Sequence, residues 1–175
     1  MMHDKEKVAQ LLLKAHDSFS KSVLSLSSEQ LKWNKEGKWN AAELLDHIVK
    51  SVKPVHFAFA LPLFLLQLMF GRTNRPSRSY EELVAKYQLK LQAGGKAPKR
   101  FCPGANIAIT KQAHILQKII AQLCARIDTL TENQLDLYIL PHPLLGKITL
   151  REMLYFTIYH VEHHHKQLQA NIPSS

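Results

Sequence analysis

Residues 149–170, TLREMLYFTIYHVEHHHKQLQA, have the pattern of an amphipathic helix. Thr149 is followed three residues later by Glu152, the arrangement of a capping box, in which each side chain bonds the other residue's backbone N–H. Apolar residues then recur at steps of three and four, which places them on one face of a helix. This stripe consists of Leu150, Leu154, Ile158, Val161 and Leu168. The segment therefore predicts a long helix that packs one face against a core.

Three other segments show the same periodicity. One stripe runs from Val8 to Leu26, another follows a second capping box at Asn40 and Glu43, and a third runs from Ile109 to Ile127. We expect helices to start near residues 5, 40, 106 and 149, with no sheet. Four one-sided helices bury their apolar faces as a four-helix bundle. The sequence thus predicts an all-α fold, a four-helix bundle, in a single domain covering residues 1–175.

Two short segments of the chain resemble each other. LSSEQLKW, residues 26–33, follows the first stripe, and LTENQLDL, residues 130–137, follows the third. Each has the composition of a short capped turn that leads into the next long helix. The match is short, and two interpretations stay open: a chance similarity, or a bundle that consists of two related helix pairs.

The predicted second and third helices are joined by a basic crossover excursion, residues 71–104. Between residues 71 and 100 it holds eight basic and two acidic residues, a net charge of +6 out of +9 for the chain. Ser79 and Glu82 form another capping box, which predicts a helix through about Leu91. The positive charge fits a solvated face, a rim that attracts an acidic small ligand, or a nucleic-acid surface.

The end of this excursion favours the rim over nucleic acid. AGGKAPKRFCPG, residues 93–104, is interrupted by Gly and Pro and has few aromatic residues to stack bases, so nucleic acid is an unlikely partner. We expect Lys96, Lys99 and Arg100 to lie at the mouth of a pocket. There they would attract a small-molecule substrate or thiol that carries a carboxylate.

An apolar run, residues 55–70, follows the predicted second helix. It is shorter than the roughly 20 residues that a membrane-spanning helix needs, and Pro62 interrupts it. We expect a core helix that continues from Asn40 and is kinked at Pro62, and no membrane span. A helix lying on a membrane surface and a homodimer interface stay open as alternatives. The chain has two cysteines and no signal-peptide pattern at its start, so we expect a cytoplasmic protein.

Ten histidines occur in 175 residues, and four of them lie in the last predicted helix. His160 and His164 are one turn apart, so they can direct two imidazoles at one point, as a zinc-binding HExxH helix does. His163 points nearly opposite the core, and we expect it to be solvated. His47, at the edge of the apolar face of the second predicted helix, is the best candidate for a third ligand. Spacing alone leaves a metal site and hydrogen-bonded structural histidines equally open.

Five histidines have no partner at ligand spacing. We interpret them as structural or surface residues. They are His3, His16, His56, His114 and His142.

Two segments resemble the DinB-like superfamily, bacterial bundles that include thiol-dependent S-transferases and the mycothiol-dependent maleylpyruvate isomerase. They are KWNAAELLDHIVKS, residues 38–51, and LREMLYFTIYHVEHHHKQL, residues 150–168. The resemblance implies that His47, His160 and His164 are metal ligands. The apolar run, the basic excursion and the absence of the family's usual Gly after the last histidines depart from that pattern.

The resemblance implies a metal-dependent enzyme that acts on a small molecule. Three histidines and an open position suit a divalent ion, zinc or nickel, that activates a thiol or a water molecule. We expect a thiol S-transferase. A hydrolase using the same site and a non-enzymatic binding protein associated with DNA damage or stress are the alternatives. The sequence names no catalytic residue beyond the ligands, because Glu43 and Asp46 fit cap and surface roles as well as that of a base.

Overall fold

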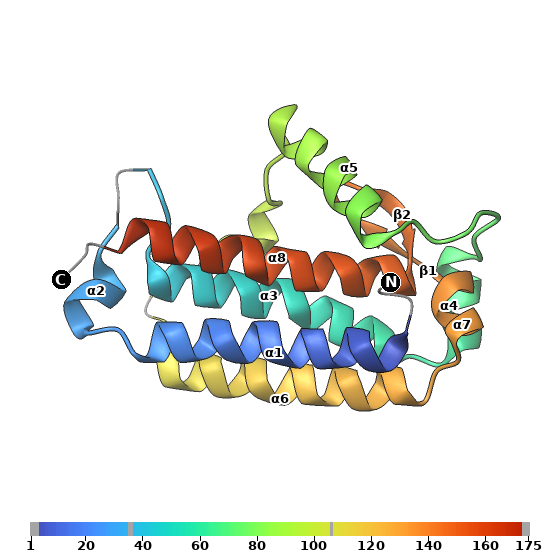
Figure 1. Cartoon of the computed structure of the whole chain (residues 1–175), viewed down its shortest axis with the longest axis horizontal. Helices are drawn as coiled ribbons and strands as arrows, with labels where there is room; N and C mark the ends of the chain where they lie inside the picture. The colour runs from blue at the N-terminus through green and yellow to red at the C-terminus, as the bar shows by residue number, and fades with distance from the viewer. Residues whose placement is uncertain (1–3, 35–36, 106, 173–175) are drawn as a thin grey trace.

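The computed structural model describes residues 4–34, 37–105 and 107–172, and these form a bundle of four long helices (Figure 1). Both α1 and α3 pack mainly against α6 and α8. The two long helices of each half of the chain therefore lie diagonally opposite each other across the bundle. The predicted all-α four-helix bundle is confirmed. The four helices are α1 (Lys5–Leu24), α3 (Ala41–Ala60), α6 (Ile109–Asp128) and α8 (Leu150–Asn171).

Capping residues set the starts of α3 and α8 where the sequence predicts them. The Asn40 side chain accepts a hydrogen bond from the backbone N–H of Glu43, whose carboxylate accepts one from the Asn40 N–H. Thr149 and Glu152 make the same reciprocal pair at α8. The predicted start near residue 106 falls partly outside the described residues, and α6 begins at Ile109. Each cap satisfies backbone donors that a helix start leaves unpaired.

The two similar segments form short helices in equivalent places. Helix α2 (Ser28–Lys32) follows α1, and α7 (Glu132–Leu137) follows α6. Both begin with a capping box. The expected capped turns are therefore present.

The basic excursion adds an outer layer to the bundle. Its helix α5 (Tyr80–Gln92) lies along the outside of α8 (Figure 1) and buries Leu83 and Tyr87. A 3₁₀ turn, η1 (Lys99–Phe101), then contacts α3. The fully buried carboxylate of Glu152 accepts hydrogen bonds from Arg75 and Arg78, which attaches the start of the excursion to α8.

The expectation of no sheet was wrong. Strand β1 (Ile139–His142) pairs antiparallel with β2 (Gly146–Thr149), with Leu140 opposite Ile148. The turn uses Gly146 at φ +75°, a conformation that glycine adopts without steric cost. Four-residue strands are too short for a period-two pattern to distinguish them from a loop between helices.

The expected kinked helix over residues 55–70 is instead two helices. Helix α3 ends at Ala60, and α4 (Leu63–Phe70) leaves at 111°. Pro62 has no N–H to continue the helix, and it holds Leu61 in an extended conformation with ψ 147°. The segment is also only partly core. Phe59 and Leu66 are buried, whereas Phe57, Phe64, Leu68 and Met69 are exposed.

No single helix within the described ranges has both the length and the hydropathy needed to cross a membrane. The bent pair α3 and α4 meets that test only when the two helices are counted together.

Candidate metal centre

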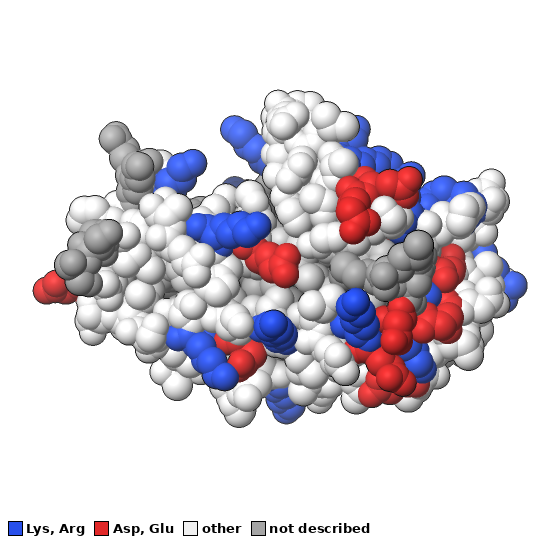
Figure 2. All heavy atoms as spheres, viewed as in Figure 1, with Lys and Arg blue, Asp and Glu red and all other residues white. Residues whose placement is uncertain are grey.

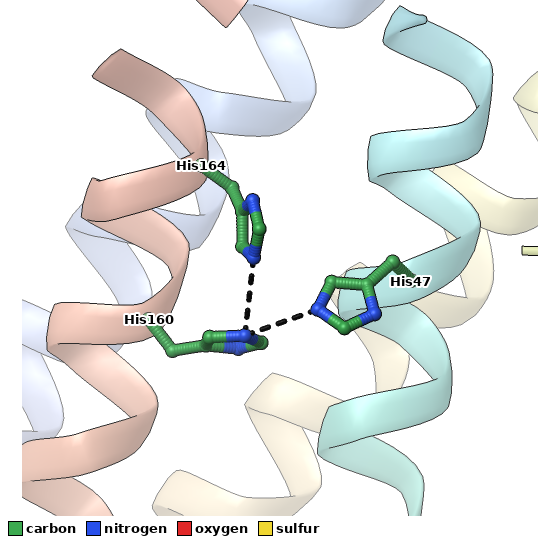
Figure 3. A group of neighbouring side chains, drawn as sticks. All are labelled: His47, His160 and His164. Atoms are coloured by element: carbon green, nitrogen blue, oxygen red, sulfur yellow. Dashed lines mark hydrogen bonds between the residues drawn. The ribbon is translucent and has the colours of Figure 1, made fainter. Parts of the chain in front are cut away.

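Three histidines converge between α3 and α8 (Figure 3). The Nε2 atom of His160 lies 3.1 Å from Nε2 of His47 and 3.2 Å from Nε2 of His164. All three side chains are buried, and each offers a ligand nitrogen within 4.8 Å of the other two. Residues 160 and 164 are one turn apart on α8, and α3 packs beside that face, which brings His47 to the same point. The structure therefore brings together the three residues that the sequence singles out.

The outer nitrogens of two of these rings are held by hydrogen bonds. His47 donates from Nδ1 to the carbonyl oxygen of Phe101, and His164 donates from Nδ1 to Oε1 of Gln167, each at 2.8 Å. With the proton on Nδ1, Nε2 of each ring is left with a lone pair directed at the cluster. Such bonds commonly fix the orientation of metal-binding imidazoles. The sequence did not identify these partners: Gln167 has helical spacing to His164, but a carbonyl 54 residues from His47 leaves no sequence signal.

Burial favours the uncharged form of each ring. It lowers the pKa of His47, and it lowers that of His164 to about 3. Burial, aided by the neighbouring histidines, lowers the pKa of His160 well below its ordinary value. At neutral pH these imidazoles therefore carry no charge and can offer lone pairs to a cation.

The spacing of the nitrogens fits one metal ion. With zinc–imidazole bonds of about 2.0–2.1 Å and nitrogen–zinc–nitrogen angles of roughly 90–110°, any two ligand nitrogens lie about 2.9–3.4 Å apart. The observed separations of 3.1 and 3.2 Å fall within that range. A single proton on His160 Nε2 could bridge to only one neighbour at a time with good geometry. A cation bound to all three nitrogens satisfies the whole cluster.

Aromatic rings flank the histidines on both sides. Trp39, just before α3, lies against His47 with ring centroids 4.7 Å apart. Phe156 stacks on His160 at 5.0 Å with an interplanar angle of 21°. These rings restrict the imidazoles to few orientations and exclude water from part of their surroundings.

Polar residues of α3 anchor the segment that carries the Phe101 carbonyl. Asp46 accepts hydrogen bonds from the backbone N–H of Gly104 and from Nε2 of Gln112, and Lys50 donates to the carbonyl of Cys102. Asp46 is 4% exposed and also pairs with Lys50 at 2.8 Å. The surface role considered for Asp46 was therefore wrong, because its carboxylate is satisfied inside the fold.

A cavity of about 550 Å³ reaches the cluster at His47 and His160. Its walls are largely apolar and come from α3, α4, α5, β1 and α8. Lys50, Lys53 and Arg100 also line it, and none of the described lining residues is Asp or Glu. The cavity therefore combines an apolar interior with positive charge.

The three basic residues predicted at a pocket mouth are placed differently. Arg100 lines the cavity and lies over the Phe101 ring at 4.8 Å, whereas Lys96 and Lys99 are not among the described lining residues. Lys50 and Lys53 line it instead. Sequence reasoning missed them because they lie on the predicted second helix and not in the excursion.

The other histidines of α8 stay outside the cluster. His163 was expected to be solvated, but it is half-buried, stacks on Tyr159 and accepts a hydrogen bond from Nε2 of Gln167. His165 is hydrogen-bonded to the hydroxyl of Ser22 at 2.8 Å. Among the remaining histidines, His3 lies outside the described residues, His16 and His142 are buried, and His114 is exposed.

Comparison with known proteins agrees with this fold. The family model of the DinB superfamily matches residues 11–168, a range that includes all three clustered histidines. Among solved structures, YfiT from Bacillus subtilis aligns with a TM-score of 0.65 and 21% sequence identity, over 97% of this chain and 86% of that chain. That protein is described as "a probable metal-dependent hydrolase with an unusual four-helix bundle topology". No curated protein sequence matches the chain.

Proposed function

Because the chain belongs to the DinB superfamily, we propose that it is a metal-dependent enzyme that acts on a small molecule. In this proposal His47, His160 and His164 bind one divalent metal ion. The observation that carries this proposal is the convergence of three buried, uncharged imidazoles at a cavity. Imidazole ligands suit zinc and nickel among the common divalent ions. Three protein ligands also leave a coordination position for a substrate atom.

Thiol transfer is the reaction that the cavity supports best. A divalent ion held by these histidines would lower the pKa of a thiol or water ligand, so that a nucleophile forms at neutral pH. None of the described lining residues is a carboxylate that could serve as a general base, which suits a nucleophile activated without one. Lys53 and Arg100 would attract the carboxylates of a low-molecular-weight thiol. In the transfer, the thiol sulfur bonds an electrophilic carbon, and the thiol proton leaves with the displaced group.

Hydrolysis at the same site is the second candidate. It is supported by the likeness to YfiT, which is described as a probable metal-dependent hydrolase. The two reactions differ in the nucleophile, a thiol in one and water in the other. The requirement for added thiol therefore separates them.

A pair of chromogenic substrates tests this proposal. 1-Chloro-2,4-dinitrobenzene reports thiol conjugation, and 4-nitrophenyl acetate reports hydrolysis or acyl transfer. With a range of low-molecular-weight thiols, a transferase gives turnover that rises with thiol concentration and is absent without it. A hydrolase gives turnover of the ester that is independent of thiol.

Both activities are expected to disappear in His160→Ala and after removal of metal by a chelator, and to return in the wild-type protein when metal is restored. Turnover that persists in metal-free His160→Ala would contradict a metal-dependent enzyme.

A further inference from the structure

His142, which the sequence marked as a structural or surface histidine, lines the same cavity. It ends strand β1 and is only 8% exposed. Its Nδ1 accepts hydrogen bonds from the backbone N–H groups of Leu144 and Leu145, at 3.2 and 3.1 Å. The ring therefore holds the turn of the hairpin through one nitrogen.

These two bonds determine where the ring proton lies. A nitrogen that accepts two N–H donors carries a lone pair, so the neutral imidazole has its proton on Nε2. Burial lowers the pKa of His142 to about 4, which keeps the ring neutral at pH 7. The Nε2–H group makes no hydrogen bond to any residue in the described part of the chain. His142 thus presents a hydrogen-bond donor of fixed tautomer in a largely apolar cavity.

Nε2 of His142 is not one of the fully buried atoms that lack a partner among the described residues, so this donor is open to the cavity and can bond water or a ligand there. Phe156 lies between this donor and the metal cluster, with its ring centroid 4.1 Å from that of His142 and 5.0 Å from that of His160. One molecule in the cavity could therefore reach both groups. A bound molecule with an acceptor atom would satisfy the donor.

The cavity walls indicate what the rest of such a molecule resembles. Phe57 and Met69 line the cavity and are also 67% and 59% exposed, so apolar side chains continue from the cavity to the surface. Apolar walls favour an apolar body through the free energy of removing that surface from water. A few placed polar groups then set the orientation of the ligand.

We propose that the Nε2–H group of His142 is a specificity-determining donor, and that the substrate is an apolar molecule bearing a hydrogen-bond acceptor such as a ketone or ester carbonyl. The assignment of this cavity as the substrate site rests on the proposed function. His142 positions the carbonyl, and the reaction itself takes place beside it, at the histidine cluster. The binding preference does not depend on the metal.

Two replacements test the acceptor role of Nδ1 and the donor role of Nε2 in His142 separately. Asn places an acceptor near the position of Nδ1 and can hold the hairpin turn, but it has no donor at the position of Nε2. Gln places an amide donor near Nε2 and loses the acceptor for the turn. His142→Asn therefore tests the donor in an intact hairpin, and His142→Gln tests whether a donor alone is sufficient.

The probes are benzophenone and 1,1-diphenylethylene, which have nearly the same shape and differ by C=O against C=CH₂. Each is titrated into the purified protein and its affinity is measured by NMR. A neutral hydrogen bond corresponds to a preference of about threefold to tenfold for benzophenone. We expect this preference in the wild type and in His142→Gln, and its loss in His142→Asn. Tyr87→Phe, which removes the phenolic hydroxyl from the cavity wall, should keep this preference.

Three results would overturn the proposal. They are failure of both probes to bind, equal affinity for the two in the wild type, and a preference that survives in His142→Asn. The ¹⁵N shifts of the His142 ring give a second measurement that needs no variant, and a proton on Nδ1 would also overturn it. Metal content is measured on the same samples. A wild-type protein that holds metal but shows no preference contradicts the proposed role of His142. A wild-type protein that shows the preference but holds no metal contradicts the proposed function instead.

Discussion

At the scale of single residues, the three clustered histidines are oriented by different kinds of partner. A backbone carbonyl holds His47, a side-chain amide holds His164, and a stacked Phe156 ring flanks His160. Helical spacing predicted that His160 and His164 face one point. The choice of His47 drew on the resemblance as well as on its place at the edge of an apolar face. The Phe101 carbonyl could not be predicted, because every residue has one and only the fold selects which is used.

Removal of single histidines tests which rings are ligands. We expect His160→Ala and His164→Ala to abolish stoichiometric metal binding, because each removes one of three ligands. His163→Ala, on the same helix, should retain it, since that ring lies outside the cluster. Metal affinity is measured by competition with a chromogenic chelator. Equal loss in His163→Ala would mean that the ligand set is wrong.

His16 links stability to pH. It is 2% exposed, donates from Nδ1 to the Leu12 carbonyl, and its Nε2 has no partner among the described residues. Burial lowers its pKa to about 4, whereas the same histidine in the unfolded chain keeps the ordinary value of about 6.5. At pH values between these two, the unfolded chain therefore binds a proton more tightly than the folded chain. Stability is therefore complete above pH 6.5 and is lost as pH falls through this window.

Replacement of His16 should remove that part of the pH dependence. At 1.36 kcal/mol per pKa unit, this group accounts for about 2 kcal/mol of lost stability between pH 7 and pH 5. We expect His16→Leu to unfold in urea with a smaller difference between these two pH values than the wild type. An unchanged difference would show that His16 is not buried in its neutral form.

At the scale of elements, the metal site depends on a segment outside the bundle. Residues 101–104 are attached to α3 by Asp46 and Lys50, and this attachment sets the position of the carbonyl that orients His47. The position of one ligand therefore depends on a carboxylate that does not touch the cluster.

Asp46→Ala tests this dependence without removing a ligand. We expect metal affinity to fall by about tenfold or more, the range found when partners that orient ligands are lost. Asp17→Ala is the matched control, because it removes a carboxylate of an exposed helical ion pair with Lys21. If the two variants bind metal equally well, the anchored segment has no effect on the site.

Elements marked by local chemistry could be predicted, and those set by tertiary contacts could not. Side-chain caps at Asn40, Ser79 and Thr149 satisfy backbone donors within four residues, so their sequence signal is direct. Pro62 indicated that the helix is interrupted near residue 62. Whether a proline kinks a helix or ends it depends on what the next segment packs against, which the sequence does not show. The diagonal placement of consecutive long helices is likewise a property of the packing and leaves no periodic signal.

At the scale of the whole molecule, residues 71–100 carry +6 of the net charge of +9, but the basic side chains do not form one continuous patch on the face shown in Figure 2. On the face shown in Figure 2, basic side chains lie in several separate groups with acidic side chains between them. Association with nucleic acid stays an unfavoured alternative, and the homodimer stays a prediction. Phe64 and Leu68 on α4, which are 68% and 81% exposed, are the apolar residues that a dimer contact would cover.

The positive charge at the cavity should act on substrate capture. We expect Arg100→Gln to raise KM for an anionic substrate or thiol by a few-fold at low salt, because Arg100 lines the cavity. The paired replacement Lys96→Gln and Lys99→Gln should have a smaller effect, since neither is among the described lining residues. Added salt should reduce both effects. An equal change in the two variants would assign the effect to net charge and not to the cavity.

The metal content of the purified protein shows whether His47, His160 and His164 form a metal site. The protein is prepared without added metal and without an affinity tag that binds metal, and it is analysed by inductively coupled plasma mass spectrometry. We expect about one divalent ion per chain, consistent with a single three-histidine site, and its removal by a chelator followed by restoration on addition of zinc or nickel. A chain that holds no divalent ion, and takes up none at micromolar concentration, would contradict the claim that these histidines form a metal site.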